Sequence, residues 1–118
     1  MKEMGYDIDG PDGIGMRLPM LAFNKLLMRG YDWFGMIGAP EADGMYSGTG
    51  MEKEIRLRDL KKALEELERV SKEVYPVLKR HDIDDHFTRY EPVVRRFTKE
   101  CIDWCKKNKK STVTIFFA

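Results

Sequence analysis

The densest group of side chains that could carry chemistry is the polar run His-Asp-Ile-Asp-Asp-His at residues 81–86, which holds both histidines of the chain. Imidazole nitrogens and carboxylates suit Zn, Mn and Fe, and such ligands four or five residues apart on a helical turn can converge. A metal site here would use His81, Asp85 and His86, and the chain would be a metal-binding protein or a small metal-dependent hydrolase. The spacing matches no mechanistic zinc motif such as His-Glu-x-x-His.

The same run has a simpler interpretation. Aspartates cap helices and stabilise turns, so a solvated connection between two helices explains the composition without any metal. Catalytic metal sites also usually gather ligands from separate elements of the fold. We therefore expect no cofactor, and we keep the metal site as an alternative.

A second group is apolar. Residues 31–37, Tyr-Asp-Trp-Phe-Gly-Met-Ile, place three aromatic side chains, a methionine and an isoleucine close together. Such side chains are enriched in the cores of protein interfaces, and exposed apolar patches mark interaction sites. The segment either covers the protein's own core or forms an interaction surface, which would comprise Trp33, Phe34, Met36, Ile37 and Tyr46.

A third group is basic. Arg95, Arg96 and Lys99 could contact phosphate groups, and four lysines follow at residues 106–110. Lys plus Arg is 21 and Asp plus Glu is 20, so the whole chain carries a net charge of only +1. That balance argues against a strongly basic nucleic-acid-binding protein. Nucleic acid is therefore not expected as the main partner, and a nucleic-acid-binding accessory protein remains an alternative.

The two cysteines, Cys101 and Cys105, are four residues apart beside Phe97 and Trp104. Four residues place them on one helical face, where a buried cysteine behaves as a small hydrophobic side chain. The pair offers no disulfide framework, and a reducing cytoplasm fits this usage. The longest uncharged apolar stretches, at residues 18–23 and 33–40, are far shorter than the roughly 20 residues of a membrane span.

Composition divides the chain into two parts. All ten glycines lie in residues 1–50, and all eight methionines lie at or before Met51. Residues 1–50 carry a net charge of −3, and residues 51–118 carry +4. With 118 residues the chain supports one modest core. We therefore predict a single domain, with an irregular part over 1–50 and a charged helical part over 51–118 that ends in a strand.

Apolar residues at three- and four-residue steps predict helices. The strongest pattern covers residues 58–80, and two others cover residues 18–29 and about 92–108. Pro76 is expected to kink or end the first of these near Tyr75. Pro92 suits a first helical position, although Thr88 offers a competing start with a capping box.

Strand patterns lie near both ends of the chain. Residues 6–9 alternate before a Gly-Pro-Asp-Gly turn, and the β-branched and aromatic run at 111–117 needs a partner. Residues 54–57 are a candidate third strand. The prediction is an α+β fold in which about three helices pack on a small sheet formed by the N-terminal and C-terminal strands. A long glycine-rich connection covers residues 31–50.

Three stretches resemble small uncharacterised proteins encoded by phages and bacteria. They are Met-Gly-Tyr-Asp-Ile-Asp-Gly at residues 4–10, Tyr-Ser-Gly-Thr-Gly at 46–50, and the ending from Val94 through a polar turn to an apolar strand. The likeness covers about half of the chain. It implies a small accessory protein and transfers no catalytic residue.

No catalytic set emerges from the sequence, and the aromatic segment favours an interaction role. The leading hypothesis is a cytoplasmic, non-enzymatic accessory or regulatory protein that acts by protein–protein contact. Its partner is an unknown protein or a second copy of the chain in a homodimer, and no membrane is expected.

Overall fold

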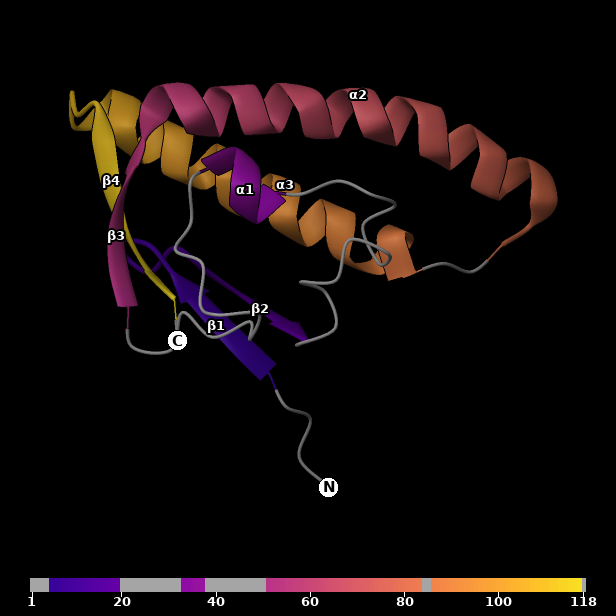
Figure 1. Cartoon of the computed structure of the whole chain (residues 1–118), viewed down its shortest axis with the longest axis horizontal. Helices are drawn as coiled ribbons and strands as arrows, with labels where there is room; N and C mark the ends of the chain where they lie inside the picture. Colours follow the sequence, from indigo (N-terminus) through magenta and orange to yellow (C-terminus); the bar gives the residue numbers. More distant parts are fainter. Residues whose placement is uncertain (1–4, 20–32, 38–50, 84–85, 118) are drawn as a thin grey trace.

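A computed structural model describes residues 5–19, 33–37, 51–83 and 86–117. Two long helices lie along each other, and a sheet packs at one end of the pair (Figure 1). The elements in chain order are β1 (Gly5–Asp9), β2 (Gly15–Pro19), α1 (Trp33–Ile37), β3 (Met51–Arg56), α2 (Leu57–His81), α3 (His86–Lys107) and β4 (Thr112–Phe117).

The sheet has four antiparallel strands in the order β2-β1-β4-β3. β3 and β4 pair along their whole length, whereas β1 meets β4 over only two residue pairs, Ile8 with Phe117 and Asp9 with Phe116. The prediction that the N-terminal and C-terminal strands share one sheet is confirmed. The third strand is confirmed as well, although it begins at Met51 and gives way to helix at Leu57.

The prediction of about three helices on the sheet is wrong. Two long helices and the five-residue α1 are present among the described residues, and the helix expected from residue 18 conflicts with the first two positions of that range. Leu18 and Pro19 belong to β2, which pairs with β1 in a hairpin that the sequence analysis missed. Residues 20–29 of that expected helix lie outside the described residues.

The hairpin turn fixes where β1 and β2 meet α3. Ile14 donates its backbone N–H to the carbonyl of Pro11 across 3.0 Å, and the residues between them, Asp12 and Gly13, have φ of 55° and 81°. Two successive positive φ values are the mark of a type I′ turn. Trp104 of α3 donates its indole N–H to the Asp12 carboxylate at 2.8 Å, which ties the turn to the helix.

Both long helices run through a proline. α2 covers Leu57–His81, which confirms the predicted extent of residues 58–80, and of the two outcomes expected at Pro76, a kink or an end, the end near Tyr75 is wrong. α3 begins at His86, six residues before Pro92. α2 ends instead at Asp82, whose φ is 51°. The backbone N–H groups of Asp82 and Ile83 donate to the carbonyls of Lys79 and Leu78, the hydrogen-bond pattern of a Schellman motif.

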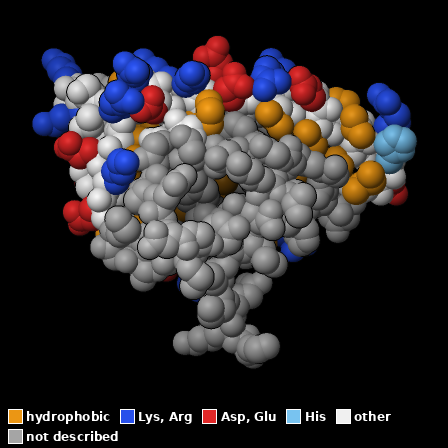
Figure 2. Space-filling model, in the orientation of Figure 1, with side chains coloured by type: hydrophobic (Ala, Val, Ile, Leu, Met, Phe, Trp, Pro, Cys, Tyr) orange, Lys and Arg blue, Asp and Glu red, His pale blue; other side chains and the backbone are white. Residues whose placement is uncertain are grey.

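One hydrophobic core holds the sheet against the helices. In β4, Val113 and Ile115 are buried and Thr114 between them is exposed, as the alternation of a half-buried strand requires. The opposite, outward face of α2 carries Lys, Arg, Asp and Glu side chains (Figure 2). Among the described residues, no helix is both long and apolar enough to cross a membrane. Other fully buried large core side chains are Ile8, Ile37, Ile55, Leu60, Leu67, Phe87, Phe97 and Phe117.

Cys101 and Cys105 are part of this core. Both thiols are free and buried. Burial raises the pKa of Cys101 to about 12, and burial also raises the pKa of Cys105. Both thiols are therefore neutral at pH 7, which confirms the interpretation of this pair as small hydrophobic side chains.

Candidate binding groove between the two long helices

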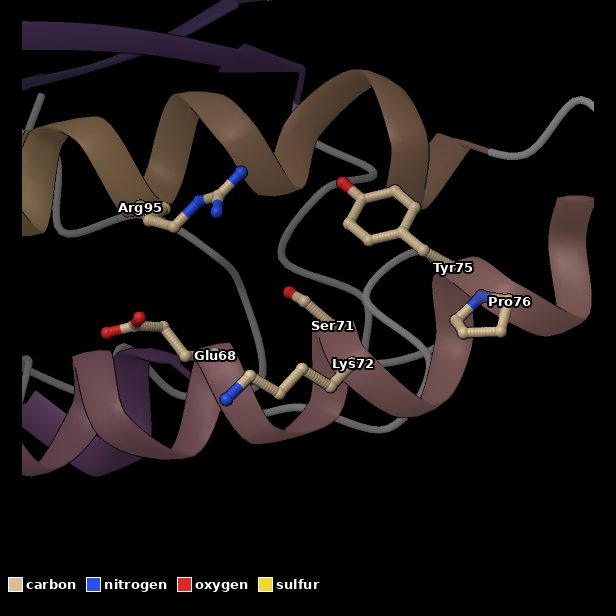
Figure 3. A pocket seen from close by; sticks show the side chains of 6 residues that line it. All are labelled: Glu68, Ser71, Lys72, Tyr75, Pro76 and Arg95. Carbon is tan, nitrogen blue, oxygen red and sulfur yellow. The ribbon is translucent and has the colours of Figure 1, made fainter.

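An open groove of about 420 Å³ lies between the second half of α2 and the facing part of α3. Figure 3 shows the side chain of Arg95 extending from α3 into the space between the helices, opposite those of α2. The α2 side chains that line the groove are Glu68, Ser71, Lys72, Tyr75 and Pro76.

A buried carboxylate joins the two helices beside the groove. Glu91 of α3 has no exposed surface, and the Tyr75 hydroxyl donates to its Oε1 at 2.6 Å. Arg95, one helical turn further along α3, places its Nε 3.1 Å from Oε2 of the same carboxylate. Oε2 accepts no hydrogen bond of good geometry from any described residue. The charge of Glu91 is thus held by a phenol on one side and a guanidinium on the other.

These contacts keep Tyr75 protonated. Burial raises the pKa of Tyr75, and the hydrogen bond to the Glu91 carboxylate and its negative charge raise it further. The positive charge of Arg95 opposes this shift and is the smallest of the four effects. Tyr75 is therefore a hydrogen-bond donor throughout the physiological pH range, and it fixes the position of the Glu91 carboxylate.

The periodicity of α3 contains the signal for this contact. Phe87, Glu91, Val94 and Thr98 follow one another at steps of three and four residues and are all buried. Glu91 therefore lies on the apolar stripe, although in the sequence it also fits the last position of the capping box that would start at Thr88. A carboxylate on an apolar stripe with an arginine four residues later indicates a buried ion pair.

The groove offers a partner several polar groups. The Ser71 hydroxyl is already engaged, because it donates to the carbonyl of Leu67 at 2.8 Å. Pro76 has no N–H, so the carbonyl of Lys72 has no helical donor and can accept a hydrogen bond from outside. Lys72 itself is exposed and makes no ion pair with a described side chain. Cationic side chains from both helices thus line the groove together with Tyr75.

The aromatic segment faces inward where it is described. Trp33 and Ile37 are 2% and 1% exposed, and Met36 is half-buried against the core. Trp33 packs edge-on against Phe97, with ring centroids 5.9 Å apart, and donates its indole N–H to the hydroxyl of Thr98 at 2.9 Å. For Trp33 and Ile37 the predicted interaction surface is corrected, because one turn of helix turns them into the core. The side chain of Phe34 and the whole of Tyr46 lie outside the described residues.

The proposed metal ligands are only partly described. His81 is exposed at the end of α2, while Asp85 and the side chain of His86 lie outside the described residues. No three described His, Cys, Asp or Glu side chains lie close enough together to hold a metal ion. The metal site therefore stays a prediction.

The three basic residues of α3 differ in their surroundings. Arg95 is held against buried Glu91, and Arg96 forms an exposed ion pair with Glu100 at 3.4 Å. Lys99 is exposed and makes no ion pair with any residue in the described part of the chain. Two of the three charges are thus already partnered within the helix, so this stripe is a weak attractor for phosphate.

The comparisons with known proteins add no relative. The chain matches no family model, no curated protein and no solved structure. The resemblance to small phage and bacterial proteins therefore stays an expectation, and the role of the groove is argued from its own chemistry.

Proposed function

We propose that this protein is an accessory binding module that acts by protein–protein contact and holds a short segment of a partner protein in the groove between α2 and α3. The observation that carries the proposal is the composition of the groove. Arg95 of α3 and Lys72 of α2 line the same groove as the aromatic ring of Tyr75 and the ring of Pro76. The partner segment would place an apolar side chain against these rings and a carboxylate near the two cations.

The apolar part of this interaction has suitable surfaces. Tyr75 is half-buried and held in place by its bond to Glu91, so its ring loses little freedom when a partner covers it. Tyrosine and arginine are enriched among the residues that dominate binding energy. These side chains together suit one or two apolar side chains of a peptide.

The charged part favours an acidic partner segment. Arg95 uses its Nε toward Glu91, which leaves the two terminal nitrogens of its guanidinium as donors. Lys72 adds an ammonium group without an ion-pair partner among the described residues. Glu68, at the other end of the groove, repels a second carboxylate and so limits where the acidic group can lie. Charge of this kind sets orientation and specificity more than affinity.

The test uses isotope-labelled protein and two short peptides that differ only in charge. Nuclear magnetic resonance would follow backbone amide signals during titration with acetyl-Asp-Leu-Glu-Phe-Glu and with acetyl-Lys-Leu-Lys-Phe-Lys. We expect saturable shifts of the amides of Ser71, Lys72 and Tyr75 with the acidic peptide and none with the basic one. Equal responses to both peptides, or shifts spread over the whole surface, would contradict the proposal.

Charge reversal provides the matched control. Lys72→Glu should weaken binding of the acidic peptide by about 5- to 10-fold, which is the effect of one lost and one repulsive charge at an exposed site on the groove. Lys61→Glu makes the same change on an exposed position of α2 outside the groove and should leave binding within about 2-fold. Light scattering adds a second outcome. A mass of twice 13.8 kDa that returns to 13.8 kDa in Lys72→Glu would assign the groove to a second copy and overturn the separate partner.

A further inference from the structure

Basic side chains gather where α2 begins and α3 ends. Residues 56–62 carry four cations and one carboxylate, a net charge of +3, and residues 106–110 carry four lysines, a net charge of +4. This region, called the basic end below, therefore holds +7, whereas the whole chain carries +1 and the remaining residues −6. Its cations are Arg56, Arg58, Lys61, Lys62, Lys106, Lys107, Lys109 and Lys110.

The fold brings the two basic segments together. The backbone N–H of Leu57 donates to the carbonyl of Ser111 at 2.8 Å, and Arg56 pairs with Thr112 across the sheet. These contacts join the first residues of α2 to the residues that directly follow the last lysine. Figure 1 shows the start of α2 and the end of α3 at the same end of the molecule, and Figure 2 shows Lys and Arg side chains over that end, with Asp and Glu side chains among them. A charge balance for the whole chain conceals this polarity.

Few of these positive charges are offset by interactions within the described parts of the protein. The macrodipole of α3 brings about half a negative charge to its C-terminus, which one lysine offsets. None of the six lysines forms an ion pair with a side chain in the described parts of the chain. Only the two arginines have a carboxylate, because Arg56 and Arg58 share Asp59 at 2.9 Å and 3.9 Å. The lysines are exposed and give this end a local excess of positive charge.

We propose that the basic end binds the phosphodiester backbone of nucleic acid without regard to base sequence. Lysine ammonium groups on flexible stems neutralise phosphates as point charges and read no base edges. An anionic membrane is the weaker fit, because stable attachment to lipid needs an apolar group as well as charge. The large hydrophobic side chains that are exposed in the described parts of the chain, Val77 and Ile83, lie near the opposite end of α2. This inference goes beyond the proposed function and uses a different surface.

The experiment measures fluorescence anisotropy with the full chain. The probes are a labelled single-stranded DNA of about 20 nucleotides, the matching duplex and an RNA of the same sequence, which distinguish the sources of phosphodiester. With about four phosphate contacts on duplex DNA, affinity should fall roughly 100-fold between about 50 and 200 mM salt. A scrambled sequence should bind within about 2-fold of the original, because phosphate contacts carry no sequence information.

Two triple variants of equal charge test the location. Lys106→Gln, Lys107→Gln and Lys110→Gln together should weaken binding at least about 10-fold and reduce the salt slope by 2 to 3. Lys109 is kept, because its φ of 53° would add backbone strain to the comparison. The control removes three exposed cations far from the basic end, Lys79→Gln, Arg80→Gln and Arg89→Gln, and should change affinity less than about 3-fold. Circular dichroism establishes that both variants are folded.

Three results would overturn the proposal. The first is no binding to any of the three nucleic acids at about 50 mM salt, where phosphate contacts are strongest. The second is an equal loss in the two triple variants, which would show a diffuse charge effect instead of a site. The third is binding to vesicles of phosphatidylserine and phosphatidylcholine without binding to nucleic acid, which would assign the basic end to lipid.

Discussion

The inward side of α3 changes character along its length. Over the sheet, Phe97, Cys101 and Cys105 are fully buried and make the contact apolar. At the other end, where α2 and α3 run beyond the sheet (Figure 1), the fully buried Glu91 lies against Tyr75. We call these regions the apolar core and the polar contact. Apolar packing tolerates partial rearrangement, whereas a buried carboxylate needs its partners in place. The polar contact therefore specifies how the helices meet at the groove, and the core supplies most of the stability.

Phe97→Ala should have the largest effect of the changes considered. The side chain is fully buried and packs against Trp33, so its removal leaves a cavity that the sheet and helices fill only in part. Such truncations lower the free energy of unfolding by about 3–5 kcal/mol. Urea denaturation followed by circular dichroism measures the loss. Val77→Ala, at a site that is 44% exposed, is the control and should stay within about 0.5 kcal/mol of the unaltered protein.

Glu91→Ala should lower the free energy of unfolding by about 3 kcal/mol, because it leaves the Tyr75 hydroxyl without an acceptor and Arg95 without its carboxylate. The same urea experiment measures the loss. Glu73→Ala removes a carboxylate that pairs with Arg69 on the exposed side of α2. It should stay within about 0.5 kcal/mol. Equal losses in the two variants would abolish the distinction between a polar contact that specifies the helix pair and an ordinary surface pair.

Tyr75→Phe sharpens the comparison through its dependence on pH. The variant should lose about 1 kcal/mol at pH 7, the usual contribution of one hydrogen bond. The pKa of Tyr75 is raised in the folded protein above the unfolded value of about 10. The stabilisation by the protonated phenol is therefore fully present below about pH 10 and is lost as pH rises through the folded pKa.

The measured quantity is the difference in free energy of unfolding between the unaltered protein and the Tyr75→Phe variant. Urea unfolding at about pH 8, 10 and 11 should show a constant advantage of the unaltered protein up to about pH 10. Above that the advantage should shrink by about 1.4 kcal/mol per pH unit, because only the unaltered protein has this group to ionise. An advantage that is the same at all three values would mean that Tyr75 is not held protonated by Glu91.

The sequence predicts the secondary structure of the apolar core well and the polar contact poorly. The apolar stripe of α2, the helical face of Cys101 and Cys105 and the terminal strands follow from local periodicity, and the structure confirms them. The hairpin partner β2 was missed because Leu18 also fits a helical spacing with later leucines, and only pairing with β1 decides between the two. Tertiary contacts of this kind override local propensity.

The polar contact was missed for a different reason. Tyr75 and Glu91 are 16 residues apart, so their hydrogen bond depends on how α2 and α3 cross and not on any local pattern. Pro76 was expected to kink or end the helix, yet the helix continues until a Schellman motif ends it at Asp82. The basic end shows the same lesson, because two segments separated by more than 40 residues of sequence combine only once the helices pair.

The last expected effects concern the two helix ends, where substitution should stabilise the protein instead of destabilising it. α2 and α3 each end in a Schellman motif whose left-handed residue is not glycine, Asp82 with φ of 51° and Lys109 with φ of 53°. Aspartate tolerates this conformation better than lysine. Asp82→Gly should therefore raise the free energy of unfolding by about 0.5 kcal/mol, and Lys109→Gly by about 1 kcal/mol because it also removes one charge from a crowded positive surface.

Salt separates the two contributions in Lys109→Gly. Repulsion among the lysines of the basic end is screened at about 1 M salt, whereas the conformational preference of glycine is not. The gain from Lys109→Gly should fall toward that of Asp82→Gly as salt rises, and the gain from Asp82→Gly should change little. A gain for Lys109→Gly that is independent of salt would show that its lysine neighbours do not repel one another in the folded protein, and the field that we assign to the basic end would then be too weak to attract phosphate.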